Sequence, residues 1–111
     1  MSKKRAPDHL APETRKWWAS VTRDWQLEPH HIRILTLAAE AWDRCTAARE
    51  QVDLEGLTVV DRFGQVRPHP LLQVERDNRL AFARLLRELR LDDTEPEDPR
   101  VPRLGDGPQS T

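Results

Sequence analysis

Apolar residues recur at helical spacing in the first part of the chain. Trp17, Val21 and Trp25 are four residues apart, and Trp18 lies beside them, so they form one apolar stripe on a helix. Proline is well tolerated at the first helical position, and the pattern predicts a helix from Pro12 to Trp25. We expect its tryptophans to anchor the helix on the core or on a neighbouring subunit, with stacking on nucleic acid as the alternative.

A second, longer helix is predicted from Pro29 to Glu55, with Gly56 as its left-handed cap. At 1.5 Å per residue it is roughly 40 Å long, more than a chain of this size needs to cover its own core. Its small and apolar residues keep a spacing of three and four, which permits close helix approach. We therefore expect an oligomer interface on this helix and its neighbour. The expected interface residues are Trp18, Trp25, Leu35, Ala38, Trp42 and Cys45.

A β-hairpin is predicted after this helix. The apolar, β-branched run 57–60 and the returning run 65–67 flank a turn that ends in Gly64. We expect Pro68 and Pro70 to block regular pairing beyond the second run and to prepare the start of another helix.

The third predicted helix runs from Leu71 to Leu91, with a broad apolar face and a row of arginines. The predicted fold is mainly α: an antiparallel helical hairpin formed by the first and the long second helix, a short β-hairpin insertion and a third helix packed on them. We expect a basic disordered arm over residues 1–11, a helical domain over 12–91 and a disordered acidic tail over 92–111.

Composition points to a soluble protein with little core. A third of the 111 residues are charged and the mean hydropathy is -0.78, and domains of this size are marginal on their own. Oligomerisation is therefore expected. A single cysteine, Cys45, excludes an internal disulfide and any zinc site built from cysteines; it is expected as a small core residue, with a reactive thiol as the alternative. We expect no apolar leader and no segment of the ~20 apolar residues that span a bilayer.

Charge is distributed unevenly along the chain. Residues 1–91 carry 16 basic and 13 acidic side chains, whereas residues 92–111 carry 2 basic and 6 acidic ones. The body is therefore basic and the tail acidic. A tail of this composition cannot bury enough surface to order itself. It is expected either to solubilise the protein or to dock on a partner or on the basic body.

Catalytic signatures are absent from the sequence. It contains no phosphate loop, dinucleotide fingerprint or nucleophile elbow, so we expect no enzyme and no cofactor. The adjacent His30 and His31 point about 100° apart on a helix, which predicts no metal site. The carboxylates of the second helix are expected on its solvated polar face. They are Glu40, Asp43, Glu50 and Asp53.

Two basic clusters are candidates for contact with DNA phosphates. The first combines the arm with the first helix and comprises Lys3, Lys4, Arg5, Arg15, Lys16 and Arg23. The second lies on the third helix and comprises Arg76, Arg79 and Arg84. An ordinary solvated terminus is the alternative for the first cluster, and ion pairing with neighbouring carboxylates or another subunit for the second. A helix-turn-helix reader built on the turn between the first two helices is a further alternative, although the second predicted helix is longer than the usual recognition helices that read a DNA groove.

The order of these features resembles the small terminase subunit of tailed bacteriophages. The resemblance covers about residues 9–93 and rests on the order and spacing of several short segments. They are the tryptophan-bearing helix from Pro12, Ala41-Trp42, Glu55 to Val60, Gly64, His69-Pro70 where the family has Asn-Pro, and Leu85 to Leu91. Two departures affect the end of the third helix. The family commonly has Phe-Gly in place of Leu89-Arg90, and a Thr-Pro-Ser-like step in place of Asp92-Asp93-Thr94.

The resemblance implies a specific role. Small terminase subunits assemble as rings, recognise the viral genome end and regulate the large subunit that holds the ATPase and nuclease. It implies a non-catalytic DNA-binding protein of the host bacterial cytoplasm, with double-stranded viral DNA, the large terminase subunit and further copies of itself as partners. The alternative is a helical oligomeric adaptor or regulator unrelated to packaging.

Overall fold

The three predicted helices are present, and their starts follow the proline signals of the sequence. The computed structural model describes residues 5–91. Within them α1 spans Pro12–Asp24, α2 spans Pro29–Glu55 and α3 spans Leu71–Leu89. A proline stands in the first turn of α1 and of α2, where its missing N–H removes no helical hydrogen bond. The fold is mainly α, as predicted.

Gly56 ends α2. Its backbone N–H donates to the carbonyl of Val52 at 2.7 Å, and its φ is +96°, a value that favours glycine. The ψ of 166° differs from the left-handed helical cap that the sequence predicted. The chain passes from the helix directly into extended backbone in the glycine-only region, which sends it straight into the first strand.

The β-hairpin consists of β1, Thr58–Val60, and β2, Val66–Pro68, paired antiparallel. The sequence predicted that strand pairing would end at Arg67, which was one residue too early. Thr58 lies opposite Pro68, and the N–H of His69 donates to the carbonyl of Leu57 at 2.8 Å. A proline removes only its own donor, and a sheet of two strands leaves each strand with one edge where that donor is not needed.

Asp61 organises the hairpin turn. Its carboxylate accepts hydrogen bonds from the backbone N–H groups of Phe63 at 2.8 Å and Gln65 at 2.9 Å, and from Arg67 Nε at 2.8 Å. These donors, Arg67 first, stabilise the charged form and lower the pKa of Asp61 below its ordinary value of 3.8. One side chain therefore fixes the turn and its attachment to β2.

The end of α3 lies at Leu89, two residues before the predicted Leu91. Arg90 follows in the left-handed helical region, with φ 59° and ψ 34°, and its N–H donates to the carbonyls of Leu86 and Arg87. This is the place where the resembled family has glycine. The helix therefore terminates as a glycine-capped helix does, although an arginine occupies the cap position.

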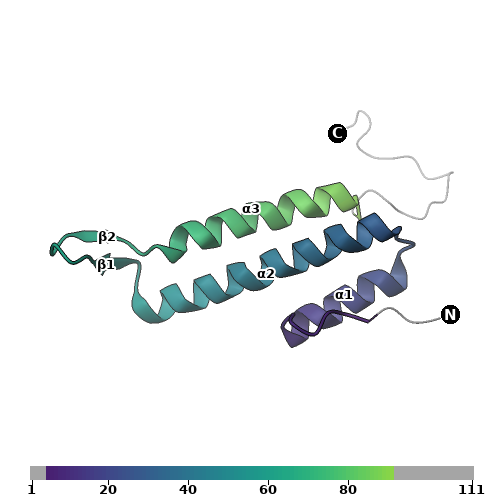
Figure 1. Ribbon diagram of the computed structural model, residues 1–111, viewed down its shortest axis with the longest axis horizontal. Helices are drawn as coiled ribbons and strands as arrows, with labels where there is room; N and C mark the ends of the chain where they lie inside the picture. The colour runs from purple at the N-terminus through teal and green to yellow at the C-terminus, as the bar shows by residue number, and fades with distance from the viewer. Residues whose placement is uncertain (1–4, 92–111) are drawn as a thin grey trace, which may run out of the picture.

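The helices lie side by side with α2 between α1 and α3 (Figure 1). Both outer helices run antiparallel to α2, and the β-hairpin projects from the end where α2 joins α3. The predicted hairpin of α1 and α2 is present, but α2 makes its more extensive contact with α3. The larger of the two helix contacts is therefore that between α2 and α3, and the two strands lie at the tip of this pair.

Buried residues lie along most of the length of α2. Near α1 the core contains Trp18, Val21, Leu35 and Ala39, closed by Leu89 from α3. Further along α2 the buried residues are mostly small: Ala38, Ala41, Cys45, Ala48 and Val52. Small side chains let two helix backbones approach closely. The spacing that suggested an interface between subunits is thus used in large part within one chain.

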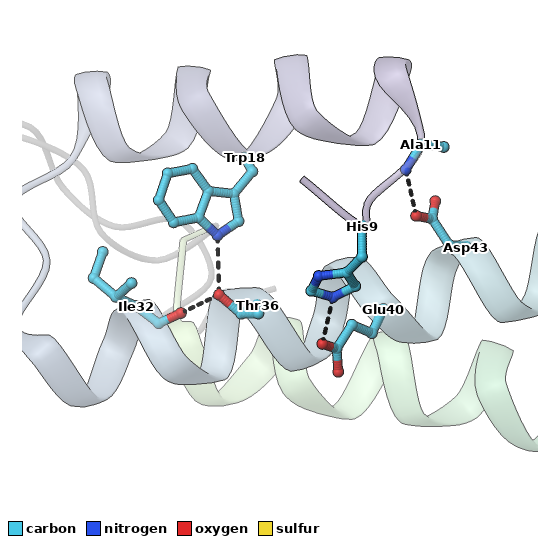
Figure 2. A network of polar contacts seen from close by, with 7 residues as sticks. All are labelled: His9, Ala11, Trp18, Ile32, Thr36, Glu40 and Asp43. Carbon is cyan, nitrogen blue, oxygen red and sulfur yellow. Dashed lines mark hydrogen bonds and ion pairs between the residues drawn. The ribbon is translucent and has the colours of Figure 1, made fainter. Parts of the chain in front are cut away.

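Side chains of α2 dock the N-terminal segment and the start of α1 (Figure 2). Asp43 accepts hydrogen bonds from the Ala11 N–H at 2.8 Å and from the Thr14 hydroxyl at 2.6 Å, while Glu40 contacts the His9 ring at 2.8 Å. Ala11 has no side chain that could cap α1. Asp43 therefore supplies from α2 the cap that α1 lacks locally.

A second polar connection joins the middle of the two helices. Trp18 Nε1 donates to the Thr36 hydroxyl at 3.0 Å, and that hydroxyl donates to the Ile32 carbonyl at 2.9 Å (Figure 2). The indole N–H, which must find a partner when buried, is satisfied by this chain. Trp18 is thereby fixed in one orientation within the core.

Residues 5–11 pack against the helices. Leu10 is buried at 2% exposure and Ala6 packs against the same cluster. Arg15 reaches back from α1 and donates to the carbonyls of Asp8 and Leu10. This part of the expected arm is therefore held by α1. Residues 1–4 and 92–111, including the expected acidic tail, lie outside the described residues.

Candidate nucleic-acid and assembly surfaces

The first predicted basic cluster is largely engaged within the chain. Arg5 lies 3.7 Å from Asp8, Lys16 lies 3.9 Å from Glu13, and Arg23 Nε donates to Asp24 at 3.0 Å. These pairs are exposed, so each contributes little and can open toward a phosphate. Arg15 instead holds the N-terminal turn through two backbone carbonyls. Lys3 and Lys4 lie outside the described residues.

The second predicted cluster is more open. Arg79 pairs with Glu75 at 3.1 Å, whereas Arg76 and Arg84 form no ion pair with any residue of 5–91. Positions 76, 80, 84 and 87 follow the three and four residue spacing of one helix face, and all four side chains are exposed. We call Arg76, Arg84 and Arg87, around Leu80, the α3 basic face.

The structure does not merge the two clusters. Lys16 and Arg23 are exposed on α1, the α3 basic face is exposed on α3, and α2 separates the two helices (Figure 1). The two clusters therefore remain separate candidates for DNA contact.

The six predicted interface residues fall into two groups. Trp18, Leu35, Ala38 and Cys45 are buried within the single chain. Trp25 is half-buried against the core, and Trp42 keeps 48% of its surface exposed. Burial by α1 and α3 explains the first group without a second subunit. Trp42 is the member of the set best placed to contact another molecule.

Trp42 belongs to a small aromatic pocket. The ring of Phe82, from α3, lies with its centroid 5.0 Å from that of Trp42 and 5.9 Å from that of Trp17 on α1. Together with Glu13 and Thr14 these rings line a cavity of about 260 Å³. We call it the aromatic pocket. Its walls come from all three helices, so it exists only once they have packed.

Exposed apolar side chains gather at the hairpin. Leu57, Val60, Phe63 and Val66 keep between 66% and 74% of their surfaces exposed, and Leu54 precedes them at the end of α2. Val60 and Val66 lie opposite each other in the strand ladder. The Arg62 guanidinium lies 5.1 Å from the Phe63 ring centroid. Apolar groups concentrated at one end of a protein mark a surface that another molecule covers.

A buried histidine joins the hairpin to α3. His69 is 5% exposed, its Nδ1 accepts the N–H of Leu71 at 3.0 Å, and its Nε2 donates to Glu55 at 2.6 Å. Acceptance at Nδ1 places the proton on Nε2. The hydrogen bond from His69, with another from Gln51, lowers the pKa of Glu55 below its ordinary value of 4.5.

Sequence reasoning missed two structural roles of polar residues on α2. Glu40 and Asp43 were expected on a solvated face but bind the segment before α1. His31 Nδ1 accepts the backbone N–H of Glu28 at 3.2 Å, which completes the start of α2. The sequence gives little sign of these roles, because the sequence pattern of a carboxylate on a helix surface is the same whether the side chain contacts water or a neighbouring N–H group. Among residues 5–91 no three histidine, cysteine or acidic side chains gather to hold a metal ion.

A comparison with protein families identifies the chain. The family described as phage terminase, small subunit, matches residues 14–97, well over half of the 111 residues. The chain belongs to the phage terminase small-subunit family. This confirms the resemblance seen in the order of sequence features. Comparison with curated proteins and with solved structures gave no match.

The match of this small-subunit chain runs through α1, α2, the hairpin and α3. The α3 basic face and most of the aromatic pocket therefore lie within the matched residues, whereas Glu13 at the pocket lies one position before them. None of the helices described in residues 5–91 has the length and apolar character needed to cross a membrane.

Proposed function

We propose that the protein is a non-catalytic small terminase subunit that binds double-stranded viral DNA as a ring oligomer and regulates the large subunit during genome packaging. The observation that carries this proposal is the family match across all three helices and the hairpin. The proposal requires no cofactor and places the protein in the host bacterial cytoplasm.

The basic surfaces support the DNA-binding part of the proposal. On the α3 basic face, Arg76 and Arg84 have no ion pair within residues 5–91, so they can meet phosphates without first losing a partner. Arg5, Lys16 and Arg23 can contribute after opening weak surface pairs. Lys3 and Lys4, outside the described residues, complete this cluster in the sequence. A ring repeats these contacts in every subunit, which raises affinity by avidity.

Charge removal tests which surface contacts DNA. We expect Arg76→Ala with Arg84→Ala to weaken binding across all DNA sequences and to reduce the slope of log affinity against log salt by about one unit for each lost contact. Lys3→Ala, Lys4→Ala and Arg5→Ala together test the first cluster in the same titration. The double change Arg33→Ala with Arg44→Ala removes two exposed charges from α2 and is the matched control.

The outcome separates the two surfaces. A loss confined to the α3 pair assigns DNA contact to α3, and a loss confined to the triple change assigns it to the first cluster. Absence of DNA binding by the wild-type protein at low salt would contradict the proposal and leave a helical adaptor or regulator as the better description.

A further inference from the structure

We propose that the β-hairpin of one copy inserts Phe63 into the aromatic pocket of the next copy, and that this contact links the subunits head to tail. The inference rests on the ring assembly of the proposed function and names the surfaces that form it. Two apolar features of the chain lack a cover within residues 5–91: the hairpin residues around Phe63, which is 74% exposed, and the aromatic pocket, where Trp42 is 48% exposed.

The size of the pocket favours a side chain over a small-molecule ligand. Its volume of about 260 Å³ lies below the ~300–1,000 Å³ typical of small-molecule sites. Its lining consists of three aromatic rings with Glu13 and Thr14 beside them. An aromatic side chain seated in such a pocket is the usual anchor of a protein interface.

The hairpin cannot fill the pocket of its own chain. Trp42 lies 13 residues before Glu55 on α2, which is about 20 Å along the helix axis at 1.5 Å per residue. The hairpin projects away from the helices beyond that end (Figure 1). A hairpin seated in an aromatic pocket must therefore belong to another copy of the chain than the pocket.

Charge complementarity identifies a second copy as the occupant of the pocket. Arg62 lies against Phe63 at the hairpin turn, and Glu13 lines the pocket with 88% of its side chain exposed. Insertion of Phe63 would bring the Arg62 guanidinium toward Glu13, whose pairing with Lys16 at 3.9 Å is loose. Val60 and Val66 would then cover the rim of the pocket, which adds buried apolar area around the anchor.

This contact is of the type that a closed ring requires. The hairpin and the pocket are different surfaces of the same chain, so their contact is heterologous. Heterologous contacts generate rings when the rotation between subunits closes. Each subunit then donates one hairpin and receives one, and no apolar hairpin remains uncovered.

The first experiment measures native mass by light scattering on the full chain. We expect the wild type to form a ring and Phe63→Ser to lower the association affinity by at least about ten-fold. Leu80→Ser is the matched control, because Leu80 is 55% exposed on the outer face of α3 and lies outside both surfaces. Far-ultraviolet circular dichroism shows whether each variant remains folded.

A charge exchange tests the pairing directly. We expect Arg62→Glu and Glu13→Arg each to weaken assembly by about ten-fold, and the two changes together to restore it, because the pair is re-formed with its charges reversed. Neither residue belongs to the buried core. The charge exchange therefore does not depend on the folding of the Trp42 variant that the mixing experiment uses.

A mixing experiment tests the head-to-tail order. Phe63→Ser keeps the pocket and loses the anchor, whereas Trp42→Asp keeps the anchor and places a charge in the pocket. At a concentration where the wild type assembles and each variant alone is monomeric, we expect their mixture to give a dimer and nothing larger, because only one productive junction can form.

The outcomes distinguish this inference from the proposed function. A ring of unchanged mass in Phe63→Ser and in both single charge reversals overturns the hairpin docking while leaving the ring intact. A wild-type protein that is monomeric at micromolar concentration removes the ring itself, and the docking with it.

Discussion

Several single side chains act in this fold at a distance from their own sequence neighbours. Asp43 is the clearest example, because it caps α1 from the middle of α2 and holds Thr14 at the same time. His69 combines a local and a distant contact, since its ring accepts the N–H of Leu71 two residues on and donates to Glu55 at the end of α2. In the resembled family this position is asparagine, another side chain able to accept a backbone N–H at a helix start. The polar residues that determine how helices start and dock are therefore partly supplied by other elements.

Removing the cap that Asp43 supplies should lower the free energy of unfolding by a measurable amount. We expect Asp43→Ala to lower the free energy of unfolding by about 1–2 kcal/mol, because the Ala11 N–H and the Thr14 hydroxyl both lose an acceptor. Chemical denaturation measures the change. Asp53→Ala is the control: Asp53 is exposed on the same helix and forms no side-chain hydrogen bond or ion pair within residues 5–91. An equal loss in both variants would refute the capping role.

The carboxylates of the hairpin joint and turn predict an acid-dependent stability. The pKa values of Glu55 and Asp61 are lowered in the folded protein from 4.5 and 3.8. Their contribution is therefore present above those ordinary values and is lost as the pH falls through the lower folded pKa values. We expect the free energy of unfolding to decrease below about pH 4.5, measured by denaturation between pH 6 and pH 3.

Substitution isolates the share of Glu55 in this acid response. Glu55→Gln keeps an acceptor for His69 but no longer titrates, so the loss of stability on acidification should be smaller than in the wild type. Glu50→Gln on the same helix is the control and should leave the response unchanged. A Glu55→Gln protein with the full acid response would show that the His69 contact is not its source.

At the scale of elements, the sequence predicted more about where helices begin than about what they pack against. Pro12 and Pro29 mark the starts of α1 and α2, and Gly56 marks the end of α2. These signals act locally, so a single sequence reveals them. The packing partner of a helix is a tertiary property. The apolar positions of α2 serve α1 and α3 together, which made buried residues such as Cys45 resemble an interface between subunits.

The candidate surfaces were predictable to different degrees. The sequence predicted a cluster of Arg76, Arg79 and Arg84 on the third helix, and two of these, Arg76 and Arg84, belong to the α3 basic face. The aromatic pocket does not follow from the sequence pattern, because Trp17, Trp42 and Phe82 come from three helices and meet only after packing. Likewise, the engagement of Arg15 with two backbone carbonyls depends on the path of residues 8–10. Proximity across elements is the information that the linear pattern lacks.

The end of α3 gives a prediction at the element scale. Arg90 adopts φ 59°, a conformation that costs an L-residue roughly 1–2 kcal/mol and glycine almost nothing. We expect Arg90→Gly to raise the free energy of unfolding by about 0.5–1 kcal/mol. Arg87→Gly, inside the helix, should lower it by about 1 kcal/mol. Thermal denaturation of both variants tests this, and a destabilised Arg90→Gly protein would contradict it.

In the whole molecule, the proposed assembly contact and the proposed DNA contact use different surfaces. The aromatic pocket lies where α1, α2 and α3 meet, and the apolar hairpin projects from the tip of the α2–α3 pair (Figure 1). The α3 basic face uses a different side of α3 from Phe82. A ring built through hairpin and pocket would therefore leave this basic face available in every subunit, which is the arrangement that a DNA-binding regulator requires.

The decisive measurement of the proposed role in packaging is ATP hydrolysis by the purified large terminase subunit, with and without this protein, in the presence of double-stranded DNA. We expect the wild-type protein to change the hydrolysis rate. Arg76→Ala with Arg84→Ala should reduce that change if the α3 basic face presents the DNA, provided that the assembled mass is unaltered. An unchanged rate of hydrolysis with the assembled wild-type protein would contradict the proposed role in packaging.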